Sequence, residues 1–210
     1  MKLLTAIILL ISFGSLYSQG EYIESGQDAY GFSIAAGYHP KVFALGGSAA
    51  VSNSGTFDFG LSYTYLFLQE ENLMDKSPST VIAPFVGFHF LKQTDTNPFA
   101  LSAQFQFNVH RITSKDESGQ TSLGSWALGG SVFHRFVISN EFSFQPFVTG
   151  GMIKPERPTG EPSPGMSAFF DLSGAFIVQK KTRQMILKPS VSISNDETVY
   201  SLSFLFVDLI

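Results

Sequence analysis

The chain has no cysteine among its 210 residues. It therefore has no disulfide framework, no thiolate nucleophile and no cysteine to accept a lipid anchor, which excludes a disulfide scaffold and a lipoprotein. An exported chain of this kind must obtain its stability in another way. A closed β-barrel does so, because each backbone N–H and C=O group finds a partner on a neighbouring strand.

Charged residues are scarce as well. They make up 14% of the chain, whereas a typical soluble domain has about 25%. Acidic residues outnumber basic ones by 17 to 13, so the basic stripe of a nucleic-acid-binding protein is missing. The sequence instead has 22 phenylalanines and 19 glycines. Little charge together with many aromatic residues favours a protein whose outer surface contacts lipid.

Long apolar runs are missing except for one near the N-terminus. Lys2 precedes an apolar stretch over residues 3–13, and small residues such as Ser15 and Ser18 follow it. This order is typical of a signal peptide, and the stretch is too short for a membrane-spanning helix. We expect cleavage after Ser18. The predicted organisation is listed in chain order: a signal peptide (1–18), a short periplasmic N-terminal segment (19–29) and a transmembrane barrel (30–210).

Residues 57–68 alternate between two kinds of side chain. Large apolar residues occupy every odd position from Phe57 to Phe67, and Asp58, Gly60, Ser62 and Thr64 lie between them. A period of two predicts a β-strand. The second face is small and weakly polar, as in the crowded interior of a barrel whose outer wall contacts lipid.

Nine further segments show related alternation. They are residues 30–38, 42–51, 80–91, 99–112, 122–138, 142–153, 168–178, 185–194 and 199–207. Most have the length that a tilted strand needs to cross a bilayer. We therefore predict an all-β fold, a closed antiparallel up-and-down transmembrane β-barrel of about ten strands. Eight strands is the alternative count, and a soluble lipocalin-like barrel or a secreted sandwich is the alternative architecture.

The connections between these segments differ in length. The three longest, residues 69–79, 113–121 and 154–167, all fall at one end if the strands run alternately up and down. Outer-membrane barrels have long extracellular loops and short periplasmic turns. The three long connections are therefore predicted to be extracellular.

These features together resemble the small outer-membrane β-barrel families of Gram-negative bacteria, over residues 19–210. Tyr200, Leu202, Phe204 and Phe206 match the aromatic assembly signal in the last strand of such proteins, although residues 207–210 continue past it. The resemblance implies a porin-like architecture in the cell outer membrane. It also implies contact with outer-membrane lipid.

Four titratable residues are predicted to point inward near the periplasmic end: Asp58, His89, Arg135 and Lys188. Buried charges have to be paired. We expect salt bridges across the lumen that plug it, because a ten-strand lumen is only slightly wider than a lumen filled by side chains. The alternative is a charged constriction in a narrow channel for ions or small solutes.

His110 and Asp171 are the only weak candidates for catalysis, and no catalytic residue is assigned. Both are predicted to face inward in the outer half of the barrel, on strands three apart. A catalytic site needs a base, an orienting carboxylate and a nucleophile within reach of one another. We expect a hydrogen-bonded lumen network and no enzyme. The resemblance leaves a surface protease or a lipid-modifying enzyme as a second alternative.

Two long loops are candidates for partner binding. The candidate residues are Glu70, Glu71, Leu73 and Met74 in the first loop, and Pro155, Arg157 and Pro158 in the second. Repeated prolines stiffen a loop and suit it to display. No metal-ligand spacing, phosphate loop or dinucleotide motif occurs, so we expect no cofactor and no metal.

The predicted function is therefore structural or partner-binding, either alone or as a subunit of a larger outer-membrane complex. The expected contacts are membrane lipid and a protein partner, bound through the extracellular loops or the lipid-facing wall. No nucleic acid is expected. A narrow channel is the alternative function.

Overall fold

The computed structural model describes residues 19–68, 79–113, 120–155, 165–194 and 197–210. The elements in chain order are η1 (Gln19–Glu21), β1 (Ala29–His39), β2 (Val42–Asn53), β3 (Phe57–Leu68), β4 (Ser79–Leu91), β5 (Ala100–Thr113), β6 (Gln120–Phe133), β7 (Phe136–Val137), β8 (Phe142–Pro155), β9 (Ser167–Lys180), β10 (Arg183–Ser194) and β11 (Glu197–Leu209). Among the described residues, no helix is long and apolar enough to cross a membrane.

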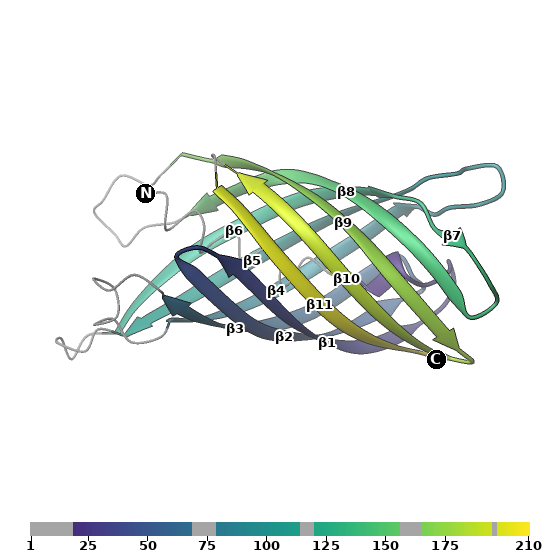
Figure 1. Ribbon diagram of the computed structural model, residues 1–210, viewed down its shortest axis with the longest axis horizontal. Helices are drawn as coiled ribbons and strands as arrows, with labels where there is room; N and C mark the ends of the chain where they lie inside the picture. Colours follow the sequence, from purple (N-terminus) through teal and green to yellow (C-terminus); the bar gives the residue numbers. More distant parts are fainter. Residues whose placement is uncertain (1–18, 69–78, 114–119, 156–164, 195–196) are drawn as a thin grey trace.

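Ten long strands within the described residues form a closed antiparallel barrel (Figure 1). Neighbours in the chain pair with each other, β6 pairs with β8, and β1 closes the sheet against β11. The predicted fold class and the count of ten strands are confirmed. Strand β3 has the predicted bounds, and the other predicted strands overlap the observed ones.

The predicted strand over residues 122–138 is interrupted. Strand β6 ends at Phe133, and β7 resumes at Phe136 in the same register against β8. Pro146 of β8 lies opposite the interruption. Proline has no N–H to donate to the ladder, so the pairing breaks there and then continues for two residues.

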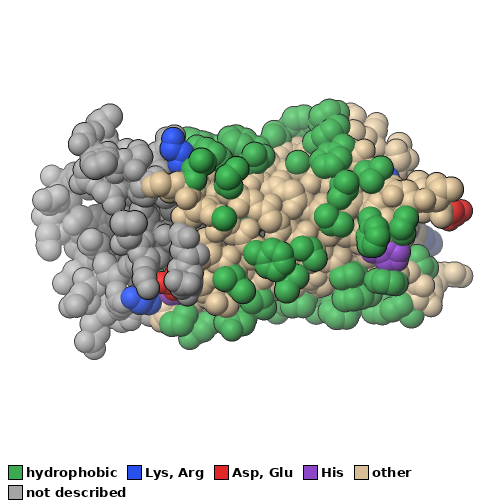
Figure 2. All heavy atoms as spheres, turned by 90° about the horizontal axis from the view of Figure 1, so that it is seen from above, with side chains coloured by type: hydrophobic (Ala, Val, Ile, Leu, Met, Phe, Trp, Pro, Cys, Tyr) green, Lys and Arg blue, Asp and Glu red, His purple; other side chains and the backbone are tan. Residues whose placement is uncertain are grey.

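The two faces of the strands differ as predicted. On β3, the outward residues Phe57, Phe59 and Leu61 are about half exposed, whereas Asp58 and Ser62 are buried. Large hydrophobic side chains are exposed in the same way around the barrel and cover much of the wall in Figure 2. Exposed large hydrophobic side chains on every long strand are unusual for a soluble monomer.

The two ends of the barrel carry different connections. We call one the turn end; it carries the connections 54–56, 92–99, 138–141 and 181–182. The other, the loop end, carries the connections 40–41, 69–78, 114–119, 156–166 and 195–196. Strand β1 begins and β11 finishes at the turn end, where Figure 1 places the C-terminus.

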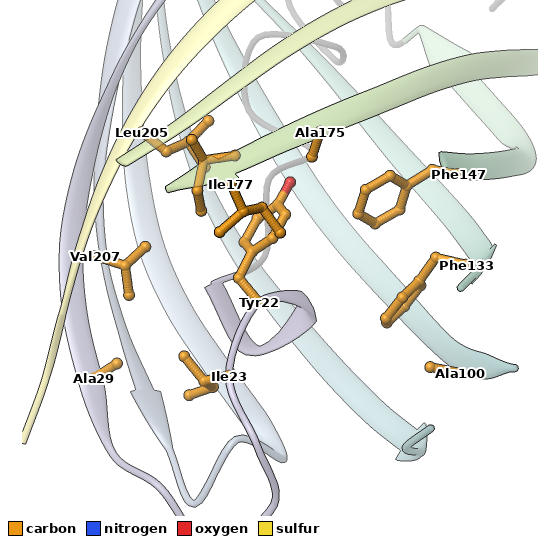
Figure 3. Close-up of a cluster of buried hydrophobic side chains, with 11 residues drawn as sticks. Tyr22, Ile23, Ala29, Ala100, Phe133, Phe147, Ala175, Ile177, Leu205 and Val207 are labelled. Carbon is orange, nitrogen blue, oxygen red and sulfur yellow. The ribbon is translucent and has the colours of Figure 1, made fainter. Parts of the chain in front are cut away.

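An apolar cluster fills part of the lumen near the turn end. Its larger wall residues are Phe133, Phe147, Ile177, Ile186 and Leu205, all buried. Tyr22 and Ile23, which belong to no strand, lie among them (Figure 3). The interior of the barrel is therefore closed around a segment that precedes the first strand.

Candidate functional site: the N-terminal segment inside the barrel

Residues 20–23, which we call the N-terminal plug, lie in the lumen at the turn end. Glu21, Tyr22 and Ile23 are 6%, 1% and 5% exposed. The chain leaves the barrel directly afterwards, since residues 24–26 are exposed. The Gly26 N–H donates to the Ser54 carbonyl at 2.9 Å, with Gly26 at a φ of 87°. Glycine adopts such a φ without strain, which allows the chain to turn from the lumen into β1.

Tyr22 is the largest side chain of the plug, and it is almost completely buried. Its ring meets Phe147 edge-on, with 5.9 Å between the ring centroids. Phe147 in turn packs against Phe133 at 5.1 Å. Figure 3 shows the Tyr22 ring directed toward the wall residues of the cluster. Aromatic side chains bury a large apolar area, so Tyr22 anchors the plug.

Wall side chains bind the backbone carbonyls of the plug. Gln145 Nε2 donates to the Glu21 carbonyl at 2.9 Å. The Tyr22 carbonyl accepts from Arg135 Nη1 at 3.1 Å and from Gln184 Nε2 at 3.2 Å. A buried backbone carbonyl without a partner is costly. These three side chains therefore remove much of the cost of placing irregular backbone in the lumen.

Gly20 is enclosed by Asp58 and His89. Its N–H donates to both carboxylate oxygens of Asp58, at 2.9 and 3.1 Å. The Nε2 atom of His89 lies 2.8 Å from Asp58 Oδ2. A Cβ atom at position 20 would lie 2.5 Å from the His89 ring. A larger residue at this position would force the imidazole or the plug to move.

The Glu21 side chain is held by two strands. Ser102 Oγ donates to Glu21 Oε1 at 3.1 Å. Lys188 Nζ lies 3.9 Å from Glu21 Oε2, and both side chains are buried. The same ammonium lies 4.0 Å from the centroid of the Phe147 ring. The Glu21 carboxylate of the plug thus pairs with the Lys188 ammonium of the barrel wall.

Lys92 follows β4 and contacts the plug from the turn end. Its ammonium donates to the carbonyls of Gly20 and Ile23, the latter at 3.1 Å. Burial lowers the pKa of Lys92 to about 8, against the opposing effect of the Asp58 and Glu21 carboxylates. Lys92 therefore loses its proton at a lower pH than a solvated lysine does.

The four residues of the predicted lumen charge cluster all lie at this site. Asp58 and His89 contact each other, as described above. Lys188 has Glu21 of the plug as an ion-pair partner, and Arg135 donates to the Tyr22 carbonyl, Ser143 Oγ and Gln179 Oε1. Three of the four residues therefore contact the N-terminal segment directly, and His89 contacts it through Asp58. Salt bridges between wall residues contribute less to the cluster than these contacts do.

Several residues of the site were missed by sequence reasoning. They are Gly20, Glu21, Tyr22, Lys92, Gln145 and Gln184. The segment 19–29 was expected to be periplasmic, but its first residues lie inside the barrel. One signal was available in the sequence: Tyr22 and Ile23 are two adjacent large apolar residues in the segment expected to be periplasmic.

The two weak catalytic candidates have separate partners. His110 Nε2 lies 3.1 Å from Ser125 Oγ. Asp171 accepts a hydrogen bond from Ser192 Oγ at 2.6 Å. The first pair joins β5 to β6 and the second joins β9 to β10. Among the described residues, no hydrogen bond or ion pair joins His110 to Asp171.

The predicted partner-binding loops fall mostly outside the described residues. This applies to Glu70, Glu71, Leu73, Met74, Arg157 and Pro158. Pro155 is the last residue of β8.

No protein-family model and no curated protein matches this sequence. Solved structures do match the fold. An outer-membrane channel from Pseudomonas putida F1 is 6% identical with a TM-score of 0.55, covering 92% of this chain and 99% of its own. The β domain of the Bordetella autotransporter BrkA is 9% identical with a TM-score of 0.52, covering 88% of this chain and 99% of its own. At such low identity the likeness concerns the fold alone: the chain has the β-barrel fold of Gram-negative outer-membrane proteins.

Proposed function

We propose that this protein is an outer-membrane β-barrel with a structural or partner-binding role, and that its own N-terminal segment closes its lumen. The turn end faces the periplasm and the loop end faces the cell exterior, in keeping with the usual asymmetry of such barrels. The exposed apolar wall and the likeness of fold support the membrane location.

The observation that carries the proposal is the buried plug with its bound carbonyls. A barrel of eight strands has an interior that side chains alone fill, and ten strands enclose only slightly more space. Tyr22, Glu21 and the wall residues Phe133 and Phe147 occupy the periplasmic end of that space. A lumen obstructed in this way does not conduct solutes, which leaves the outer wall and the loops as the surfaces for interaction.

A channel that opens when the plug leaves is the second candidate function. The inner face of β5 supports it, because Gln104, Gln106, Asn108 and His110 form a polar row above the plug. Polar side chains of this kind line water-filled pores. Apart from the buried Tyr22 ring, the plug is held by hydrogen bonds and one ion pair, which water replaces at modest cost.

Single-channel recording in planar bilayers tests the closed lumen. The folded protein is compared with a variant lacking residues 19–26 and with Gly20→Val, whose side chain would collide with His89. Gly165→Ala is the matched control, because nothing lies within 4 Å of a Cβ atom there.

We expect no steady conductance from the unaltered protein or the control, and conductance steps from the deletion variant and Gly20→Val. Steady conductance of equal size in all four proteins would overturn the closed lumen. Brief openings of the unaltered protein, prolonged in Gly20→Val, would favour the gated channel over the structural role. A difference in gel mobility between heated and unheated samples would show that each variant is a folded barrel.

A further inference from the structure

The outer wall has a hollow of about 810 Å³ at the turn end. It lies on the lipid-facing side of β1, β10 and β11, next to the turn that joins β9 to β10. None of the residues of the plug lines it, although Gln184, whose side chain donates to the Tyr22 carbonyl, also belongs to its lining. The hollow and the plug therefore lie on opposite sides of the same stretch of wall.

Aromatic and other apolar side chains form the floor of the hollow. Phe32 of β1 and Phe206 of β11 stack with 4.9 Å between their ring centroids. Tyr30, Phe32 and Met185 are about half exposed, at 52%, 56% and 47%. The floor is continuous with the apolar wall above it, so an acyl chain lying along the wall would extend into it.

Basic side chains border the hollow at its periplasmic edge. Lys180, Lys181 and Arg183 come from the tight turn between β9 and β10, in which Lys181 has a φ of 57°. This left-handed conformation is typical of two-residue hairpin turns. All three side chains are exposed. Among the described residues that line the hollow, Asp208 is the only acidic one, and it lies 3.3 Å from Arg183 Nε.

We propose that this hollow binds one phospholipid of the periplasmic leaflet, with its phosphate at the basic turn and an acyl chain on the aromatic floor. The proposal rests on the membrane location given under the proposed function. Aromatic residues gather at the level of lipid headgroups, and here the Tyr30 hydroxyl donates to Asp208, the partner of Arg183. The positive edge complements a phosphate, and the apolar floor complements the chain attached to it.

Charge and position favour a lipid over a protein as the occupant. The cations lie at the turn end, just beyond the exposed apolar residues Val178 and Met185. In a bilayer spanned by the apolar wall, this end of the wall would meet the phosphates of one leaflet. A lipid in the bilayer already has its phosphate and its acyl chain at the two matching levels. It therefore enters the hollow without the ordering cost that a protein segment would have.

Native mass spectrometry of the folded barrel, released from detergent micelles containing phosphatidylglycerol, tests the proposal. The test variant combines Lys180→Gln, Lys181→Gln and Arg183→Gln. The matched control combines Lys41→Gln, Arg111→Gln and Lys154→Gln, which removes two lysines and one arginine near the loop end.

We expect the unaltered protein and the control to retain one phospholipid, and the test variant to retain it at least tenfold less. Equal retention by the test variant and the control would overturn the proposal, as would several lipids bound with equal strength or none at all. The conductance traces do not depend on these three side chains. Failure here would therefore leave the closed lumen standing, and an open lumen would leave the lipid site standing.

Discussion

The Asp58 carboxylate lies 2.8 Å from the Nε2 atom of His89, and both side chains are completely buried. In the register of β3 and β4, Asp58 faces Gly87, so His89 is its diagonal neighbour on the inner face. Such neighbours are within reach of long side chains. Since Gly20 donates to the same carboxylate, the pair joins the wall of the barrel to the segment that closes it.

Replacing Asp58 is expected to loosen the plug. Asp58→Asn removes the charge that strengthens the two hydrogen bonds from Gly20, and hydrogen bonds to charged groups contribute about 1.5–3 kcal/mol. Bilayer recordings of Asp58→Asn should show conductance steps, which the unaltered protein lacks. Asp171→Asn is the control, because Asp171 lies in the same lumen and has Ser192 as its hydrogen-bond partner. Equal opening frequencies in the two variants would show that Asp58 does not hold the plug.

Removing the Tyr22 side chain is expected to destabilise the barrel. Tyr22→Ala would leave a void against Phe147, and deleting a buried aromatic side chain typically costs about 3–5 kcal/mol. The measurement is the urea midpoint of the folded protein in lipid vesicles. Tyr22→Phe, which retains the ring, should keep most of the stability. A midpoint for Tyr22→Ala that matches the unaltered protein would place the ring outside the lumen.

The ion pair between Glu21 and Lys188 implies that substitutions of these two residues have coupled effects on stability. Lys188→Met alone leaves the buried Glu21 carboxylate without its cation, which typically costs about 3–5 kcal/mol. Adding Glu21→Gln removes the uncompensated charge, so the double variant should regain much of the lost stability. A double-mutant cycle on the urea midpoints measures the coupling. Additive effects would contradict the contact.

The lowered pKa of Lys92 predicts that opening of the plug depends on pH. Its pKa is about 8 with the plug in place, whereas a solvated lysine has a pKa of about 10.4. Between these values the closed state binds fewer protons than the open one, so raising the pH favours closure. In the Asp58→Asn variant, whose loosened plug is expected to open, openings should become rarer from pH 7.5 to 9.5, and Lys92→Met is added to this same variant. Lys92→Met should abolish this pH dependence. If the pH dependence persists without Lys92, another titratable group causes it.

The strands could be predicted from the sequence because the alternation of apolar and polar residues depends only on the side of the sheet on which each residue lies. Phe57 to Leu68 therefore appeared with its observed bounds and faces. The interruption after Phe133 depends on Pro146 in the neighbouring strand, which becomes visible only once the register is known. The inward direction of Lys188 and Asp58 followed from the same alternation.

The partners of those inward charges could not be predicted in the same way. Residues 20–23 have no period, so no pattern placed them in the lumen. Lys188 meets Glu21, from a segment 167 positions earlier in the chain, because the closed barrel encloses that segment. The sequence analysis paired His110 with Asp171 because both were expected to face inward at a similar depth. In the structure each has a serine hydroxyl on the adjacent strand as its partner.

Thiol labelling tests the position of the N-terminal segment most directly. The chain has no cysteine, so Ile23→Cys and Ser25→Cys each introduce a single thiol. Position 23 is 5% exposed, and position 25, two residues on, is exposed. In the folded barrel, a water-soluble maleimide should label Ser25→Cys at least tenfold faster than Ile23→Cys, and in urea the two rates should be equal. Equal rates in the folded barrel would contradict the plugged lumen.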